Sequence, residues 1–204
     1  MSERSPITWN EALSRLKDGN ARYAAGRSEH PRADALRRAE TAEQGQHPFA
    51  AVVGCSDSRV PIEIIFDQGV GDLFVIRVPG NVCNGDEIGA VEYAVEHLDT
   101  PLCVVLGHTR CGAVSSVATG APLHGHLARL VTNIRQAVAR ARTEQPSVED
   151  HRLIETIVRT NVQQSIADLL QGSPTLRERV AQGTLKTVGA VYDVVSGAVQ
   201  WIED

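Results

Sequence analysis

Two side chains that can bind a metal ion follow two apolar runs of the sequence, each directly after a glycine. The run 52–54 leads into Cys55, and the run 105–107 leads into His108. If the two runs are neighbouring strands of a parallel sheet, their carboxyl ends meet at the edge where open sheets bind ligands. We therefore expect Cys55 and His108 to lie close together in the folded chain.

A second thiol lies three residues beyond this histidine, so that His108 and Cys111 form an H-x₂-C pattern. One tight turn can present such a pair to a single ion. The pattern alone is weak evidence for metal, because a cysteine at the end of a strand is usually just buried. Thiolate and imidazole ligands suit zinc, and three protein ligands leave one tetrahedral position open, as in catalytic zinc sites.

An aspartate and an arginine follow Cys55 at alternate positions, so that in an extended chain Cys55, Asp57 and Arg59 point the same way. A bidentate pair with Arg59 would hold Asp57 away from a metal ion and leave it able to accept the proton of zinc-bound hydroxide. If Arg59 let go, Asp57 could become a fourth ligand and close the site. The alternative is that Asp57 and Ser58 only cap a helix that begins near Pro61, a role that we expect for Ser58.

The elements that must position these residues alternate between strand and helix. Continuous apolar runs at 49–54, 73–76 and 102–107 are typical of strands buried on both faces of a parallel sheet. Helical segments at 60–67 and 86–98 separate them, which predicts an α/β fold with right-handed crossovers.

The rest of the chain is expected to surround this core. Thr8 is predicted to cap a first helix with Glu11 as its reciprocal partner, and residues 32–44 are predicted to form a second helix. The chain is expected to be mainly helical after 112. Residues 186–193 and 198–202 are expected to form two strands joined by a turn at Ser196-Gly197.

These elements predict a central, mainly parallel sheet of about four strands plus an edge strand, surrounded by helices. With no linker visible, we expect one domain over 1–204. Its parts are an N-terminal helical arm (1–46), an α/β core with the zinc site (47–120), and a helical region with the C-terminal strands (121–204).

The composition excludes several classes of function. The chain has 204 residues, 42% of them hydrophobic, and a net charge of −5, which is ordinary for a globular protein. Residues 47–120 contain nine acidic residues and three basic ones, Arg59, Arg77 and Arg110, and no basic stripe is present. Nucleic acid and membranes are therefore poor partner candidates. The absence of a secretory leader and of a spanning apolar run predicts a cytoplasmic protein with reduced thiols.

The two motifs together resemble the β-class carbonic anhydrases. The match is carried by Cys55-Ser56-Asp57-Ser58-Arg59 and Gly107-His108-Thr109-Arg110-Cys111-Gly112, with further similarity at 71–77 and 92–95. The resemblance implies one Zn²⁺ per chain on Cys55, His108 and Cys111, with Asp57 and Arg59 as a dyad. It also implies reversible conversion of carbon dioxide and water to bicarbonate and a proton by attack of zinc-bound hydroxide, since zinc lowers the pKa of bound water to about 7.

The resemblance further implies substrate-binding residues and a partner subunit. Gln46 stands where related enzymes place a substrate-binding glutamine, and Phe74 where they place an apolar pocket wall. Gly112 of the second motif is a third substrate-binding candidate. In the family, residues at the positions of Gln46 and Phe74 reach the site across a dimer interface, and the N-terminal helices pack on a neighbouring subunit. A homodimer is therefore expected, with a tetramer as the alternative.

Two other functions stay open at this point. Related sites hydrolyse carbonyl sulfide or carbon disulfide with the same ligands, and a non-catalytic homologue could be closed permanently by Asp57. The presence of Arg59 argues against the closed module, because a closing aspartate needs no guanidinium partner. His126 is a hypothetical proton shuttle, since histidine titrates near neutral pH; an exposed or helix-packing role is the alternative.

Overall fold

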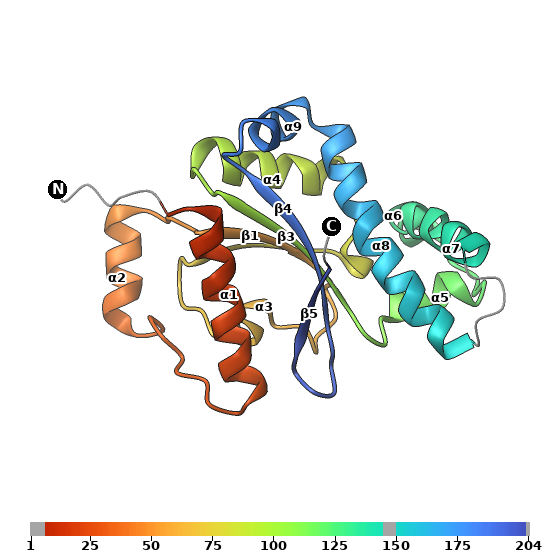
Figure 1. Cartoon of the computed structure of the whole chain (residues 1–204), viewed down its shortest axis with the longest axis horizontal. Helices are drawn as coiled ribbons and strands as arrows, with labels where there is room; N and C mark the ends of the chain where they lie inside the picture. Colours follow the sequence, from red (N-terminus) through yellow and green to blue (C-terminus); the bar gives the residue numbers. More distant parts are fainter. Residues whose placement is uncertain (1–6, 145–149, 203–204) are drawn as a thin grey trace.

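The computed structural model describes residues 7–144 and 150–202, and its centre is a five-stranded sheet with the order β2-β1-β3-β4-β5 (Figure 1). The strands are β1 (Ala50–Gly54), β2 (Leu73–Arg77), β3 (Leu102–His108), β4 (Lys186–Tyr192) and β5 (Val199–Ile202). The first four pair in parallel, and β5 is antiparallel to β4. The predicted sheet of four parallel strands and an edge strand is confirmed.

The inner strands are buried on both faces because successive side chains alternate across the sheet. Val53 of β1 and Val105 of β3 belong to one core cluster, which contains Ile157 and Val162 of the long helix α8 (Asp150–Gly172). Val52 and Val104 belong to a second cluster with residues of α1 (Trp9–Ala24). This two-sided burial explains the apolar runs without alternation in the sequence.

Helices lie on both sides of the sheet in Figure 1, with α1–α3 on one side and α5–α8 on the other. Besides α1 and α8, they are α2 (Ala35–Gln44), α3 (Ile62–Ile65), α4 (Gly85–His97), α5 (Gly112–Ala118), α6 (Gly125–Leu130), α7 (Thr132–Glu144) and α9 (Pro174–Ala181). A 3₁₀ turn, η1 (Pro79–Asn81), follows β2. Within the described ranges, no helix is both long and apolar enough to cross a bilayer.

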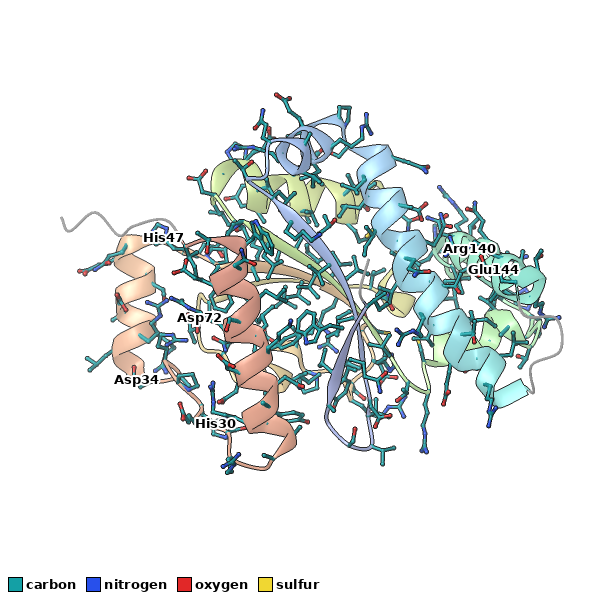
Figure 2. All side chains as sticks on the ribbon, viewed as in Figure 1. His30, Asp34, His47, Asp72, Arg140 and Glu144 are labelled. Atoms are coloured by element: carbon teal, nitrogen blue, oxygen red, sulfur yellow. The ribbon has the colours of Figure 1, made fainter. Side chains whose placement is uncertain are left out.

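The two N-terminal helices pack very differently. The predicted capping box of α1 is confirmed, because Thr8 Oγ1 accepts the Glu11 amide at 3.3 Å and Glu11 accepts the Thr8 amide at 2.9 Å. This helix packs on the sheet of the same chain, where Leu16 is buried. By contrast, α2, capped by Asp34 (Figure 2), buries no residue and leaves Leu36 81% exposed. Packing of this region on a neighbouring subunit stays a prediction.

One detail of the prediction is wrong. The helix α3 begins after Pro61 and has no side-chain cap, so Ser58 does not cap it. Instead, a turn leads into the helix, in which the main-chain carbonyl of Asp57 accepts the amide of Val60 at 3.0 Å and Asp57 Oδ1 accepts the amide of Arg59 at 3.0 Å. The C-terminal turn is as expected: Asp193 accepts the amide of Ser196 at 2.7 Å, and Gly197 takes φ 77°.

Candidate metal centre

The pairing of β1 with β3 brings the three candidate ligands together. Gly54 lies opposite Leu106 in the register of these strands, so the residues that follow them emerge at the same edge of the sheet. The ligand atoms of Cys55, His108 and Cys111 all lie within 4.8 Å of one another, and all three residues are buried. Cys55 and the His108–Cys111 pair, which lie far apart in the sequence, thus form one compact cluster.

The imidazole of His108 has one nitrogen committed and one free. Its Nδ1 lies 2.9 Å from the main-chain oxygen of Thr109, and a carbonyl only accepts, so Nδ1 carries the proton. The Nε2 atom then has a lone pair, is buried, and has no hydrogen-bond partner among the described residues. A buried nitrogen without a partner is costly, and a metal ion would satisfy it.

The two thiols of the cluster lie close enough to share a proton. The sulfur atoms of Cys55 and Cys111 are 4.0 Å apart, and Cys55 Sγ also accepts the amides of Gly80 at 3.3 Å and Asp57 at 3.4 Å. The Cys111 contact, helped by these amides and opposed by burial, lowers the pKa of Cys55 to about 4. The same contact, together with burial, raises the pKa of Cys111. One thiolate, one thiol and one free imidazole nitrogen fit a zinc ion.

Asp57 lies at the rim of this cluster in a two-point ion pair. Arg59 donates Nε to Oδ1 at 2.9 Å and Nη2 to Oδ2 at 2.7 Å. These hydrogen bonds hold the pKa of Asp57 well below its usual range. The Oδ2 atom is 3.9 Å from His108 Nε2, so the carboxylate is near the ligand atoms but occupied by Arg59. The ion pair with Arg59 thereby keeps this carboxylate from approaching the three ligand atoms more closely.

A second arginine, Arg77 at the end of β2, fixes the loop that carries Cys55 and Asp57. It donates Nε to the carbonyl of Cys55 at 3.1 Å and Nη2 to the carbonyl of Asp57 at 2.6 Å. In the sequence this arginine stands out only as one of three basic residues in an acidic region. The missing signal was the β1–β2 register, which pairs Gly54 with Arg77.

Gly80 also supports the cluster and was not singled out in the sequence. It takes φ 75°, and a Cβ there would lie 2.6 Å from Ile134 Cδ1, so the turn η1 requires glycine at this position. Its amide reaches Cys55 Sγ, and its carbonyl accepts Asn161 Nδ2 at 2.8 Å. The long helix α8 thereby holds the amide that faces the thiolate.

The other four candidate residues lie outside the ligand cluster, at different places in the fold. Gly112 directly follows Cys111 and opens α5. Gln46 is exposed between α2 and β1, Phe74 is half-buried on β2 with its ring 5.9 Å from that of Tyr93, and His126 is exposed on α6. Within the described part of the chain, no hydrogen bond joins Gln46 or His126 to the cluster.

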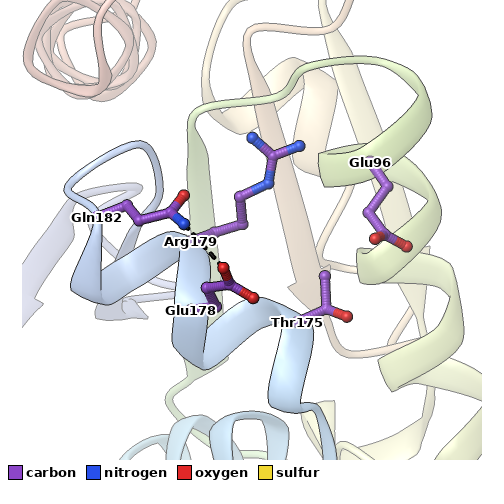
Figure 3. A pocket seen from close by; sticks show the side chains of 5 residues that line it. All are labelled: Glu96, Thr175, Glu178, Arg179 and Gln182. Atoms are coloured by element: carbon purple, nitrogen blue, oxygen red, sulfur yellow. Dashed lines mark hydrogen bonds between the residues drawn. The ribbon is translucent and has the colours of Figure 1, made fainter.

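Neither of two hollows on the described surface has a residue of the cluster in its lining. One, of about 260 Å³, lies between α4 and α9 and is bordered only by polar side chains, among them Glu96, Glu178 and Arg179 (Figure 3). The other, of about 210 Å³, adjoins the loop that carries His108 and includes Thr109 and Arg110 in its lining.

Known proteins with similar sequences and structures match almost the whole of this chain. Residues 50–199 match the family model described as "Carbonic anhydrase". "Carbonic anhydrase 2" of Mycobacterium tuberculosis (strain ATCC 25618 / H37Rv) is 39% identical over 201 residues, which cover 97% of this chain and 93% of that protein. The β-carbonic anhydrase CafA of Aspergillus fumigatus has a similar structure, with a TM-score of 0.75, 31% identity, and coverage of 94% of this chain and 90% of that one.

A third similar protein bears on assembly. One of two β-carbonic anhydrases from Sordaria macrospora, described as tetrameric, has a TM-score of 0.75 and 27% identity to this chain. The match covers 96% of each of the two chains.

Proposed function

The chain belongs to the β-class carbonic anhydrases, and from this premise we propose that it catalyses the zinc-dependent, reversible hydration of carbon dioxide to bicarbonate and a proton. The observation that carries the proposal is the unpartnered Nε2 of His108, which faces two thiols beside a carboxylate held by an arginine. Cys55, His108 and Cys111 would hold one zinc ion. Bound there, zinc would acidify a coordinated water and supply hydroxide at neutral pH.

Asp57 is proposed to orient the attacking oxygen. Its low pKa keeps the carboxylate ionised at every working pH, so it acts only as an acceptor. Accepting the hydrogen of the attacking hydroxyl turns a lone pair of that oxygen toward the carbon of the substrate. Arg59 keeps the carboxylate in this role, because a carboxylate bound at two points by a guanidinium is not free to become a fourth ligand.

Three residues are proposed to form the substrate pocket. The Gln46 side-chain amide would donate to an oxygen of carbon dioxide or bicarbonate, and Phe74 would supply an apolar wall suited to a small uncharged substrate. Gly112, without a side chain, would leave room next to Cys111. Because Gln46 is exposed and lies apart from the cluster of its own chain, we propose that it acts in the site of a partner subunit.

The assembly, the domain organisation and the compartment are also proposals. A homodimer or tetramer is supported by the exposed α2, and a tetramer by the printed description of the Sordaria macrospora relatives. The whole chain is taken as one domain, of which residues 1–6, 145–149 and 203–204 lie outside the described structure. A cytoplasmic location fits two thiols that must stay reduced to bind metal.

His126 is proposed as a proton shuttle on its exposed position alone. A shuttle passes protons to buffer, so replacement by alanine should make turnover more dependent on buffer concentration. Unchanged buffer dependence of His126→Ala would remove this residue from the mechanism.

Stopped-flow hydration of carbon dioxide with a pH indicator tests the proposed function on zinc-loaded protein, from about pH 6.5 to 9. Activity that requires zinc and increases with pH is the expected result. Absence of activity at every pH, with zinc bound in a one-to-one ratio, would overturn it. Carbonyl sulfide would then be the next substrate to test, and a closed structural site the remaining interpretation.

A further inference from the structure

The cavity of about 210 Å³ beside the metal cluster lies at the carboxyl ends of β3 and β4, against α8. Its lining combines Val158 and Val191, which are buried and form its floor, with the exposed arginines Arg110 and Arg159. We propose that this cavity is a second binding site, separate from the metal site, for a small phosphate-type dianion held between Arg110 and Arg159.

The two arginines of the cavity are uncommitted. Among the described residues, neither the Arg110 nor the Arg159 side chain makes a hydrogen bond or an ion pair. The nearby Arg59 and Arg77 differ, because each donates both Nε and Nη2 to carboxylate or carbonyl oxygens. Two free guanidinium groups at one cavity are suited to a dianion, which each can bind at two points.

Two carboxylates also border the cavity, and they differ in how far each offsets the positive charge of Arg110 and Arg159. Asp193 is already held by the amides of Val195 at 2.9 Å and Ser196 at 2.7 Å, and by the Thr109 hydroxyl at 3.4 Å. The Ser196 hydrogen bonds keep the pKa of Asp193 below its usual range, so these donors balance its charge locally. The remaining opposing charge is Glu155.

Glu155 lies one helical turn before Arg159 on α8 but forms no ion pair with it in the described structure. It therefore repels a bound anion without occupying the guanidinium. Removing the charge of Glu155 should therefore strengthen anion binding, whereas removing an arginine should weaken it.

The position of Arg110 links the cavity to the metal cluster. Arg110 lines the cavity, its carbonyl accepts Arg59 Nη2 at 3.0 Å, and its backbone has a positive φ of 57°. The cavity exceeds what one phosphate group fills, so the floor of Val158 and Val191 leaves room for a short carbon skeleton. Inorganic phosphate and a phosphate monoester share the chemistry that the arginines recognise.

Isothermal titration calorimetry tests the proposal on the zinc-loaded protein at about pH 8, where phosphate is mainly dianionic. Sodium azide, a monovalent anion, is present throughout to occupy the open metal position. Inorganic phosphate and glycerol 3-phosphate are titrated separately. Saturable binding of one equivalent is expected, and tighter binding of the ester would identify an organic phosphate as the occupant.

Three matched changes on α8 decide whether binding occurs in this cavity. Arg159→Gln should weaken phosphate binding about tenfold, and Glu155→Gln should strengthen it about threefold. Arg152→Gln removes an exposed charge from the same helix outside the cavity and should change affinity less than twofold. Circular dichroism and zinc content confirm that each variant is folded. Absence of saturable binding, or equal losses in Arg159→Gln and Arg152→Gln, would overturn the proposal.

Discussion

Arg59 donates a hydrogen bond through Nη2 to the main-chain carbonyl of Arg110 at 3.0 Å. The same guanidinium holds Asp57 at two points, so one side chain ties the loop after β1 to the loop after β3. The first loop carries Cys55, and the second, which follows His108 at the end of β3, carries Cys111. The spacing of the metal ligands and the orientation of the aspartate therefore depend on one planar, forked group.

Replacing Arg59 by lysine should lower kcat/KM about tenfold to hundredfold, although the charge is kept. A lysine ammonium cannot bind both carboxylate oxygens in the plane of the fork and also reach the second loop. Asp57 would then be free to take the fourth ligand position and displace the attacking water. Stopped-flow hydration assays measure the loss, and zinc content shows that the metal is retained.

Arg135→Lys is the matched control, because Arg135 is exposed on α7, away from the helix proposed to pack on a partner subunit, and its side chain makes no hydrogen bond or ion pair among the described residues. It should leave kcat/KM within twofold of the wild type. Wild-type activity in Arg59→Lys would show that the forked geometry of Arg59 does not matter for the reaction.

The sequence predicts the parallel sheet and the convergence of the ligands because both depend on local patterns. Runs buried on both faces mark the strands, and a glycine followed by Cys55 or by His108 marks where each run ends. The roles of Arg77 and Gly80 were not predictable in this way. Arg77 reaches the Cys55 loop only through the register of β2 with β1, and Gly80 reaches the sulfur only through the turn η1.

The Ser58 cap failed for a related physical reason. Ser58 lies three residues before Pro61, a spacing that suits a helix cap, but the chain makes a turn at Asp57, and α3 follows it without a side-chain cap. The exposed positions of Gln46 and Leu36 could not be inferred from spacing either, since they depend on what the first two helices pack against.

Zinc binding should release about one proton from its protein ligands near pH 7, counted apart from the proton of a coordinated water, whose release follows its own pKa of about 7. At this pH Cys55, with a pKa of about 4, is already a thiolate, whereas Cys111 is still a thiol because its pKa is raised. His108 contributes no proton, because its Nε2 already has a lone pair. Calorimetric titration of metal-free protein with zinc, in buffers of different ionisation enthalpy, counts the protons released.

Cys83→Ala, which changes a buried thiol outside the ligand cluster, should leave the ligand count at one. Two protons released by the protein ligands at pH 7 would contradict the low pKa of Cys55.

Mixing of two inactive variants should restore activity if Gln46 acts across a subunit interface. Gln46→Ala lacks the substrate contact, and Cys55→Ser lacks a metal ligand. A mixed dimer contains one site with an intact cluster and an intact glutamine from the partner, so about a quarter of wild-type activity is expected after random exchange. Stopped-flow assays before and after co-refolding measure the recovery.

The pairing of Gln46→Ala with His108→Ala should behave in the same way, whereas the pairing of Cys55→Ser with His108→Ala should stay inactive. Both residues of this last pair lie in one cluster of one chain. Failure of the first two mixtures, with exchange of subunits verified by mass spectrometry, would place Gln46 in its own site or outside the site.

Asp67 should provide acid-sensitive stability to the connection between α1 and α2. Its fully buried carboxylate accepts Arg22 Nε at 2.6 Å and the amides of Glu29 at 3.0 Å and His30 at 2.9 Å. Burial alone would raise its pKa, but these donors outweigh burial and lower it. Because the folded pKa is below the unfolded one, the stabilisation is complete above about pH 4 and is lost as the pH falls through the folded value.

Asp67→Asn should therefore reduce the free energy of unfolding by about 2–4 kcal/mol at neutral pH, since an amide cannot replace a charged acceptor of three donors. The difference from the wild type should shrink as the pH falls from about 5 to 3, because acid removes the same charge. Urea unfolding of the metal-free proteins across this range measures both effects. Asp99→Asn is the control, because Asp99 has a similar φ of 51° but is exposed and without side-chain contacts among the described residues. A loss that stays constant with pH would show that the shape of the Asp67 side chain, rather than its charge, holds this connection.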